Sequence, residues 1–358
     1  MLTKAAERMV EQELSDAKKA SILIGVRTKD EQFISGSIHD DPHNDDLGNA
    51  VFEIGSTTKT FTSLLLAKCI LANKVSLDEP VASYKPEYKR ALTHNGKEVT
   101  FRNLSTHLSG LPREDMKTIR HSVKKNKDAR DNPYKYFTKT NLNQFFLDFD
   151  LKQEINKKWR YSNVGIGLLG NTLADILGVS YEEAIQSEIL APLGMNDTFV
   201  TGTEEQQQRY VQAYNKKSEP VPPMVLPGMN GAGALKSTLR DMLRYVDHQM
   251  GLVNSPLREE IELTQHIQAQ TKWKEFHMGL GWFIETKKWS PYPIIHHGGT
   301  TMGFHTYCGF MKETQTGIVI CSTIQLKALR MVKMLLNLTG GVNENIAKEI
   351  FSQSEFLK

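Results

Sequence analysis

A serine and a lysine three residues apart are the first pair in this sequence that could do chemistry. Ser56 follows Gly55 in the run FEIGSTTKTFTSLLLA, and Lys59 follows about one helical turn later. A serine hydroxyl is a weak nucleophile until a base takes its proton, and a partly desolvated amine can be that base near neutral pH. A helix N-terminus also offers unpaired N–H groups to an oxyanion. The pair predicts an acyl-transfer site, although S-x-x-K alone equally fits a helix cap with a surface lysine.

A second candidate segment is Tyr161-Ser162-Asn163, which opens the helical run VGIGLLG. A tyrosine hydroxyl placed near Ser56 and Lys59 could act as general base and then as the acid that protonates the leaving group. The Asn163 amide could hold the lysine or a substrate carbonyl. By itself Y-x-N carries little information, since a packed tyrosine and a capping asparagine have the same spacing.

A third candidate segment is IIHHGGTTMGF, a late strand that ends in His297-Gly298-Gly299. Glycines such as Gly299 remove the side-chain wall and let a ligand approach the backbone. The N–H of Thr300 would then point into the same site as that of Ser56. Successive strand side chains face opposite sides, so His296 and His297 are not expected to share a metal ion.

The elements that must position these residues are strands near both termini and helices between them. Strand-like runs bounded by turns predict strands at 21–28, 32–38, 278–285, 301–311 and 316–324. Helical patterns predict helices at the N-terminus and over 56–71, 141–149, 164–177, 326–338 and toward 351. This order predicts an α+β fold, with an antiparallel sheet built from both termini, flanked by helices, and a mostly helical inserted region. We expect a sheet domain of residues 1–76 and 230–358 and a helical domain of residues 77–229, with the active site at their junction.

Two polar stretches between these elements suggest less specific roles. The run HDDPHNDD at 39–46 has adjacent rather than fold-placed ligands, so we interpret it as a connection around Pro42 and not as a metal site. The basic segment 116–139 is long for a connection. It could be a mobile solvated insertion, a lid, or a docking site for an acidic partner or membrane surface.

Composition narrows the class of protein. The 358 residues are 39% hydrophobic and 24% charged, which is typical of a globular protein, and a net charge of +3 does not indicate a nucleic-acid partner. The longest apolar stretch, 64–72, is too short to span a bilayer, and the N-terminus has no signal-peptide pattern, so we expect a cytoplasmic protein, or an extracellular one if a leader was removed. Three cysteines in apolar surroundings predict buried thiols. No metal or organic cofactor is expected.

In this order, the three segments resemble the serine β-lactamase and penicillin-binding protein superfamily. The branch is the one shared by class C β-lactamases, D-alanyl-D-alanine peptidases and related esterases. Four further segments support the resemblance: TFRNLSTHLSGLP, ILAPLGMNDT, GAGALKSTLRDM and GLGW. The resemblance thus extends from about residue 21 to about residue 323. The resemblance implies Ser56 as nucleophile, Lys59 and Tyr161 as acid–base partners, Asn163 as a substrate and lysine contact, and an oxyanion hole from the N–H groups of Ser56 and Thr300. As a hypothesis for the mechanism, we expect Tyr161, made more acidic by Lys59, to accept the Ser56 proton.

One departure from that branch bears on the substrate. Class C β-lactamases have lysine, threonine and glycine where this chain has His297, Gly298 and Gly299, and that lysine helps to bind the substrate carboxylate. A histidine is charged only part of the time near neutral pH. We therefore predict a serine hydrolase acting on a small-molecule or short-peptide ester or amide, a carboxylesterase or D-amino-acid-type peptidase. The alternatives are a β-lactamase or penicillin-binding DD-carboxypeptidase, and an inactive binding protein on the same fold.

Overall fold

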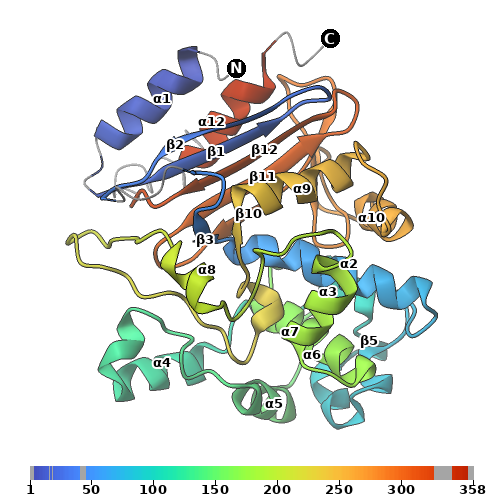
Figure 1. Cartoon of the computed structure of the whole chain (residues 1–358). Helices are drawn as coiled ribbons and strands as arrows, with labels where there is room; N and C mark the ends of the chain where they lie inside the picture. The colour runs from blue at the N-terminus through green and yellow to red at the C-terminus, as the bar shows by residue number, and fades with distance from the viewer. Residues whose placement is uncertain (1–3, 16, 18, 41–45, 326–340, 354–358) are drawn as a thin grey trace.

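The computed structural model describes residues 4–15, 17, 19–40, 46–325 and 341–353 (Figure 1). The helix predicted over 326–338 lies outside the described residues, as does most of the polar run 39–46. The fold is α+β, as predicted from the order of elements. The division into domains at residues 77 and 230 stays a prediction.

The largest element is an eight-stranded antiparallel sheet built from both ends of the chain. Its spatial order is β2-β1-β12-β11-β10-β9-β8-β7. The N-terminal β1 pairs with the C-terminal β12, which joins the two halves of the sheet. The strands are β1 (Ile22–Arg27), β2 (Gln32–Ser37), β7 (Ala269–Gln270), β8 (Phe276–Met278), β9 (Phe283–Thr286), β10 (Pro293–Thr300), β11 (His305–Met311) and β12 (Thr316–Ser322).

Helices cover both faces of this sheet. The predicted N-terminal helix is α1 (Lys4–Ser15), and it packs with α12 (Val342–Phe351) on the outer face, where a separate apolar cluster lies. The inner face is covered by α9 (Leu239–Met250), which contacts β1, β11 and β12 (Figure 1). Strands buried on both faces are rich in Ile and Val, which explains why the terminal strands could be predicted.

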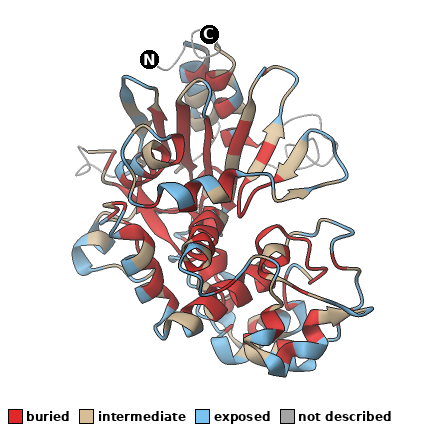
Figure 2. Ribbon diagram, turned by 90° about the vertical axis from the view of Figure 1, so that its right-hand side faces the viewer, coloured by how far each residue is buried: buried red, intermediate tan, exposed pale blue. Residues whose placement is uncertain are grey.

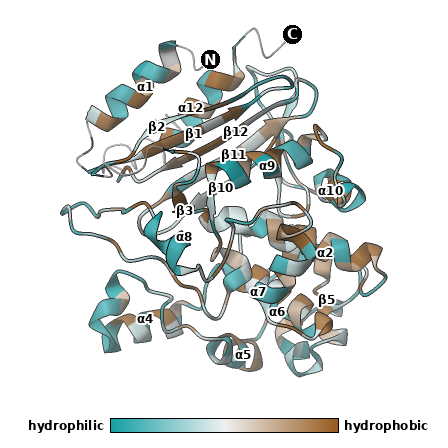
Figure 3. Cartoon of the chain, in the orientation of Figure 1, coloured by the Kyte–Doolittle hydropathy of each residue, from teal (hydrophilic) through white to brown (hydrophobic). Residues whose placement is uncertain are grey.

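Below the sheet, the remaining helices pack around α2 (Thr58–Leu71), most of whose residues are buried. Figure 2 shows the buried residues concentrated along the middle of the molecule, whereas Figure 3 shows α4 and α8 as mostly hydrophilic. The other helices are α3 (Phe101–Ser105), α4 (Met116–Lys125), α5 (Lys139–Asp148), α6 (Asn163–Leu177), α7 (Tyr181–Ile185), α8 (Glu204–Gln208) and α10 (Arg258–Gln265). Short strands β3 (Val51–Glu53) and β6 (Lys236–Thr238) pair with each other, as do β4 (Thr93–His94) and β5 (Lys97–Glu98).

Short helical segments connect or extend several of these elements. They are η1 (Gly55–Thr57), η2 (Val81–Ser83), η3 (Pro86–Leu92), η4 (Lys127–Arg130), η5 (Gln186–Leu190) and η6 (Asn230–Ala232). Within the part of the chain that the structure describes, no single helix is long and apolar enough to cross a membrane. Only the bent pair Asn163–Leu177 and Tyr181–Leu190 reaches that length and composition, at an angle of 81°.

Two strand predictions were wrong in their bounds. The single strand predicted over 278–285 is a hairpin of β8 and β9, because Gly281 adopts a φ of +71° and a Cβ there would lie 2.7 Å from the Lys59 carbonyl oxygen. The strand predicted over 301–311 starts only at His305. Thr301 donates its N–H to the Phe304 carbonyl at 2.9 Å, which closes the β10–β11 hairpin.

Candidate active site

The site begins at the turn that connects β3 to α2. Gly55 has a φ of +50°, and Ser56 follows it in η1, which continues directly into α2. Ser56 is therefore at the N-terminus of the combined helix, as predicted. A Cβ at Gly55 would lie 3.0 Å from the backbone nitrogen of Thr300, so β10 runs directly beside this turn. The first helical N–H groups and the end of β10 meet at the serine.

Lys59 is buried within α2 and reaches back to the serine. Its Nζ lies 3.0 Å from Ser56 Oγ and donates to the Ala232 carbonyl at 2.5 Å. The side chain has no exposed surface, and this burial lowers the pKa of Lys59 well below its usual range. Glu114 raises that pKa in part, and Arg113 lowers it further. Burial therefore favours a neutral amine, which can accept a proton from Ser56.

Tyr161 closes the other side of the serine. Its hydroxyl is hydrogen-bonded to Ser56, and the Lys59 Nζ lies 4.8 Å from the centre of its ring. Burial raises the pKa of Tyr161, which outweighs the opposing effects of the Ser56 hydrogen bond and the Arg113 charge. The phenol is therefore less acidic than usual, because desolvation dominates, and an acidifying effect of Lys59 itself stays a prediction. Tyr161 is held in its protonated form.

Asn163 lies where the motif predicted, but with a different partner. Ser162 caps α6 by accepting from the Gly165 N–H at 2.9 Å, which fixes Asn163 in the first turn. The Asn163 Nδ2 donates to Glu114 Oε1 at 2.6 Å, and its Oδ1 has no hydrogen-bond partner among the described residues. Lys59, which was predicted to contact Asn163, instead donates to the carbonyl of Ala232 in η6.

The last segment of the site is the end of β10. The His297 Nδ1 donates to the Gly298 carbonyl at 2.7 Å, and its ring stacks on Phe283 with centroids 4.6 Å apart. Burial, and then the neighbouring Lys59, lower the pKa of His297 to about 3. This imidazole is therefore neutral at physiological pH and cannot replace a lysine as a cation. His296 turns to another partner, with its Nε2 2.9 Å from Glu285 Oε2.

Gly299 is required by packing as well as by access. A Cβ at this position would lie 2.0 Å from the Ile54 carbonyl oxygen, so a side chain would separate β10 from the turn that holds Ser56. We expected the missing side chain at Gly299 to let a ligand approach the backbone. In the structure, it first makes room for the carbonyl of Ile54. Thr300, next to it, is exposed at the edge of the site.

These residues line one cavity of about 580 Å³. Its walls include the predicted Ser56, Tyr161, His297, Gly299 and Thr300, and it extends along β10 and β11 to the start of α12. Lys59 and Asn163 lie behind these walls. In the part of the chain described, no group of three or more His, Cys, Asp or Glu side chains is arranged to hold a metal ion.

Comparisons with known proteins agree with this arrangement. A family model described as Beta-lactamase matches residues 7–338. The chain belongs to the beta-lactamase family. Among its relatives, the D-alanyl-D-alanine-carboxypeptidase/endopeptidase AmpH of Escherichia coli (strain K12) is 28% identical over 311 residues, covering 84% of this chain and 76% of that protein. A beta-lactamase of Psychrobacter immobilis is 26% identical, covering 83% and 77%.

Solved structures show the same fold for this beta-lactamase family chain. A class C beta lactamase from Rhodobacter sphaeroides superposes with a TM-score of 0.74 at 22% identity, over 94% of this chain and 98% of that one. A beta-lactamase/D-alanine carboxypeptidase from Pseudomonas syringae gives 0.76 at 22% identity, over 98% and 99%. Membership of this family makes the chain a serine hydrolase of the β-lactamase and transpeptidase fold.

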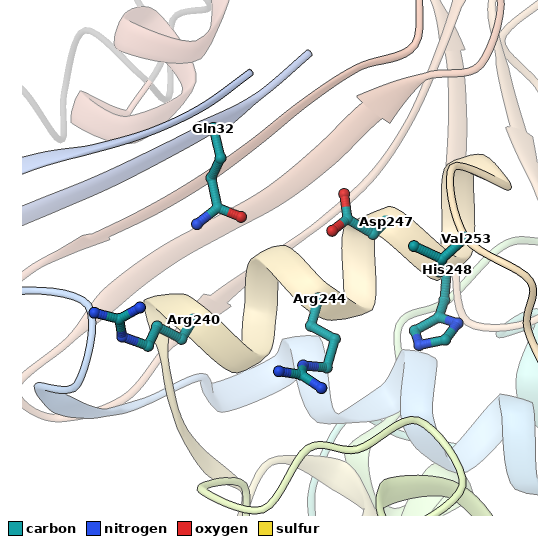
Figure 4. A pocket seen from close by; sticks show the side chains of 6 residues that line it. All are labelled: Gln32, Arg240, Arg244, Asp247, His248 and Val253. Atoms are coloured by element: carbon teal, nitrogen blue, oxygen red, sulfur yellow. The ribbon is translucent and has the colours of Figure 1, made fainter. Parts of the chain in front are cut away.

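A second hollow, of about 400 Å³, lies along α9 and contains none of the predicted site residues. Figure 4 shows Arg240, Arg244 and Asp247 on this helix, with Gln32 above them. Arg240 pairs with Asp46 at 2.7 Å and Asp247 with Arg27 at 2.5 Å, so these charges stabilise the fold. The predicted site residues line the cavity at Ser56 instead.

Three residues of the site were not predicted from the sequence. His107 packs its ring 4.4 Å from that of Tyr161, Arg113 lies 5.0 Å from the same ring, and Glu114 contacts Asn163. His107 belongs to the run TFRNLSTHLSGLP, which we used only as supporting likeness, and Arg113 and Glu114 follow directly after it. A histidine and a charge pair next to a Gly-Leu-Pro turn could have been singled out on residue type alone.

Proposed function

We propose that this family member hydrolyses esters or amides through an acyl-enzyme on Ser56. The observation that carries the proposal is the 3.0 Å approach of Ser56 Oγ to the Nζ of a fully buried Lys59. The amine, neutral because it is desolvated, takes the Ser56 proton as Oγ attacks the substrate carbonyl. The N–H groups of Ser56 and Thr300 hold the oxyanion, a contribution worth ~10²–10³ in rate for each donor.

Collapse of the tetrahedral species breaks the bond to the leaving group. The proton held by Lys59 returns to the departing oxygen or nitrogen through Tyr161, which is protonated and hydrogen-bonded to Ser56. Water then attacks the acyl-enzyme by the reverse proton path and releases the acid. Tyr161 therefore acts as a proton relay, and Lys59 is the first base.

The substrate class is argued from the charge at the end of β10, because Arg113 and Lys216, the cations that also line the cavity, come from other segments. A neutral His297 offers no cation to a substrate carboxylate, so we propose a neutral ester or an internal amide as the preferred substrate, like that of an esterase or endopeptidase. The AmpH relative is named a D-alanyl-D-alanine-carboxypeptidase/endopeptidase, and the second of these activities is cleavage of an internal amide. A dedicated β-lactamase is the less favoured function, because β-lactam substrates carry a carboxylate.

The experiment is covalent labelling followed by intact-mass measurement. The wild-type chain should gain one fluorophosphonate adduct, and Ser56→Ala should gain none. Failure of the folded wild type to react would overturn the proposal and favour a binding protein on an inactive fold.

A matched pair of thioesters tests the substrate class. One carries a free carboxylate beyond the scissile bond and the other a carboxamide at the same position. We expect higher kcat/KM for the carboxamide in the wild type, and a shift toward the carboxylate in His297→Lys. Rapid turnover of penicillin, or stable labelling by it, would instead support the lactamase or peptidase alternative.

A further inference from the structure

A buried glutamate in contact with Asn163, Glu114, has no role in the mechanism above. The Glu114 side chain is 6% exposed, and its Oε1 accepts hydrogen bonds from Tyr134 Oη at 2.8 Å and from Asn163 Nδ2 at 2.6 Å. Its Oε2 is buried and, among the described residues, has no hydrogen-bond partner. Burying a carboxylate that is short of donors costs free energy of folding. A nearby positive charge is the interaction that can offset this cost.

The loop that carries Glu114 is fixed to the start of α6. The Arg113 carbonyl accepts from the Asn163 N–H at 2.9 Å and from the Val164 N–H at 3.3 Å. Ser162 Oγ donates to the Pro112 carbonyl at 2.6 Å. These bonds join the residues directly before Glu114 to those directly after Tyr161. The carboxylate is therefore held in place relative to the catalytic groups.

We propose that Glu114 is a positioning residue that sets the protonation of Lys59, and that its neighbour Arg113 opposes it. The inference rests on the proposed function, in which Lys59 takes the Ser56 proton. The geometry places both charges close to the amine, because the Lys59 Nζ and the Arg113 guanidinium lie 4.8 and 5.0 Å from the centre of the Tyr161 ring, and Arg113 in turn lies beside Glu114. Glu114 acts on Lys59 through its charge, which the buried surroundings screen weakly. Arg113 is 67% exposed, with its Nε 3.9 Å from Glu114 Oε1, so water screens its effect more strongly.

The other titratable groups around Lys59 are uncharged near pH 7, so Glu114 and Arg113 are the charges that set its protonation. His107 and His297 both face the amine, and burial lowers the pKa of each, so both are neutral near pH 7. Tyr161 is kept protonated by its own burial. Against this neutral surrounding, burial lowers the pKa of Lys59, Glu114 raises it and Arg113 lowers it.

Glu114 also orients the amide of Asn163. A carboxylate only accepts hydrogen bonds, so it holds Nδ2 toward itself and leaves Oδ1 on the opposite side of the amide. Tyr134, which comes from the basic segment 116–139, donates to the same oxygen and limits its movement. The segment thus contributes a contact that supports the active site.

The test is the pH dependence of labelling of the full chain by a fluorophosphonate. The rate rises with pH as Lys59 loses its proton. In Glu114→Gln the acidic limb should move to lower pH, because the charge that favours the protonated amine is gone. In Arg113→Gln it should move to higher pH. Glu114→Asp, which keeps the charge, should restore the limb toward its wild-type position.

Glu262→Gln is the matched control, since it removes one negative charge from the exposed face of α10 and should leave the limb in place. If the acidic limb of the pH profile of Glu114→Gln stays at the wild-type position, even with a lower rate at every pH, the role of Glu114 is purely structural. That result would overturn the inference. A shift of the acidic limb in the same direction for Glu114→Gln and Arg113→Gln would overturn the inference as well. Should Glu114→Gln fail to fold, the direction of the limb in Arg113→Gln decides. A wild type that takes no label at any pH would instead disprove the proposed function.

Discussion

Among the residues that the structure describes, two lysines are buried in comparable surroundings, one at the candidate active site and one in the β3–β6 ribbon. Lys59 has no exposed surface and Lys236 is 7% exposed, and burial lowers the pKa of both. Each has a buried glutamate nearby that raises its pKa, Glu114 for the first and Glu53 for the second. Residue type, burial and charge therefore do not distinguish the two regions.

Hydrogen bonding separates them. The Lys236 Nζ donates to three backbone carbonyls, those of Val200, Met224 and Ala234, at 3.1, 3.2 and 3.4 Å. Lys59 donates to one carbonyl and approaches a serine hydroxyl. An ammonium has three donors, so Lys236 is saturated by groups that cannot react, whereas Lys59 faces a group that can. Incomplete hydrogen bonding thus distinguishes the buried amine that we propose as the base from the one that only stabilises the fold.

The largest expected effect is on the activity of Lys59→Met. Removing the amine leaves Ser56 without its base, and the fluorophosphonate labelling rate should fall by ~10⁴, the upper end of what general base catalysis supplies. The melting temperature should equal or exceed that of the wild type, because a desolvated amine is removed. The labelling rate and a thermal melt check both. A labelling rate within tenfold of wild type would show that Lys59 is not the base.

This contrast could not be predicted from the sequence. The S-x-x-K spacing correctly placed Lys59 within reach of Ser56, because helix geometry fixes that distance locally. For Lys236, in the segment GAGALKSTLRDM, the three carbonyls come from separate parts of the chain. Contacts of that kind depend on tertiary packing, which a local pattern does not contain.

The same limit explains the errors and omissions at the site. The sheet from both termini could be predicted because β1 and β12 are strongly apolar, whereas the turn at Gly281 depends on its approach to α2. Asn163 was expected to contact Lys59, but its partner is decided by where the loop of Glu114 packs. The raised pKa of Tyr161 likewise follows from a burial that no motif reveals.

The next effect in size concerns Tyr161→Phe and depends on the leaving group. Because burial keeps Tyr161 protonated, we expect it to deliver a proton rather than to take one from Ser56. An alkyl ester, whose alkoxide must be protonated, should lose ~10² in kcat/KM. A nitrophenyl ester, whose leaving group departs as an anion, should lose much less. If kcat/KM falls equally for the two esters, Tyr161 rather than Lys59 is the base that takes the Ser56 proton.

A smaller effect, on stability rather than activity, is expected for Lys236→Met. Three carbonyls lose their donor and Glu53 loses its opposite charge, which should lower the free energy of unfolding by about 1–3 kcal/mol. The labelling rate should stay within a few-fold of the wild type. Urea denaturation and labelling of the same sample measure both quantities. A loss of labelling without a loss of stability would remove the distinction between the two lysines.

The smallest expected effect is a pH dependence of stability that arises in the active-site region. The pKa of His297 is lowered from 6.5 to about 3 by burial and by Lys59, so the unfolded chain binds more protons than the folded chain between these values. The free energy of unfolding therefore falls as pH falls from 6.5 toward 3, and the contribution is fully present above 6.5. His297→Gln should reduce the drop in melting temperature between pH 7.5 and pH 5, whereas His121→Gln, on the exposed surface of α4, should not. If both variants keep the wild-type slope, other groups carry the acid sensitivity. If the slope is reduced only in His297→Gln, the acid sensitivity arises in the region where Lys59 is also buried with few partners.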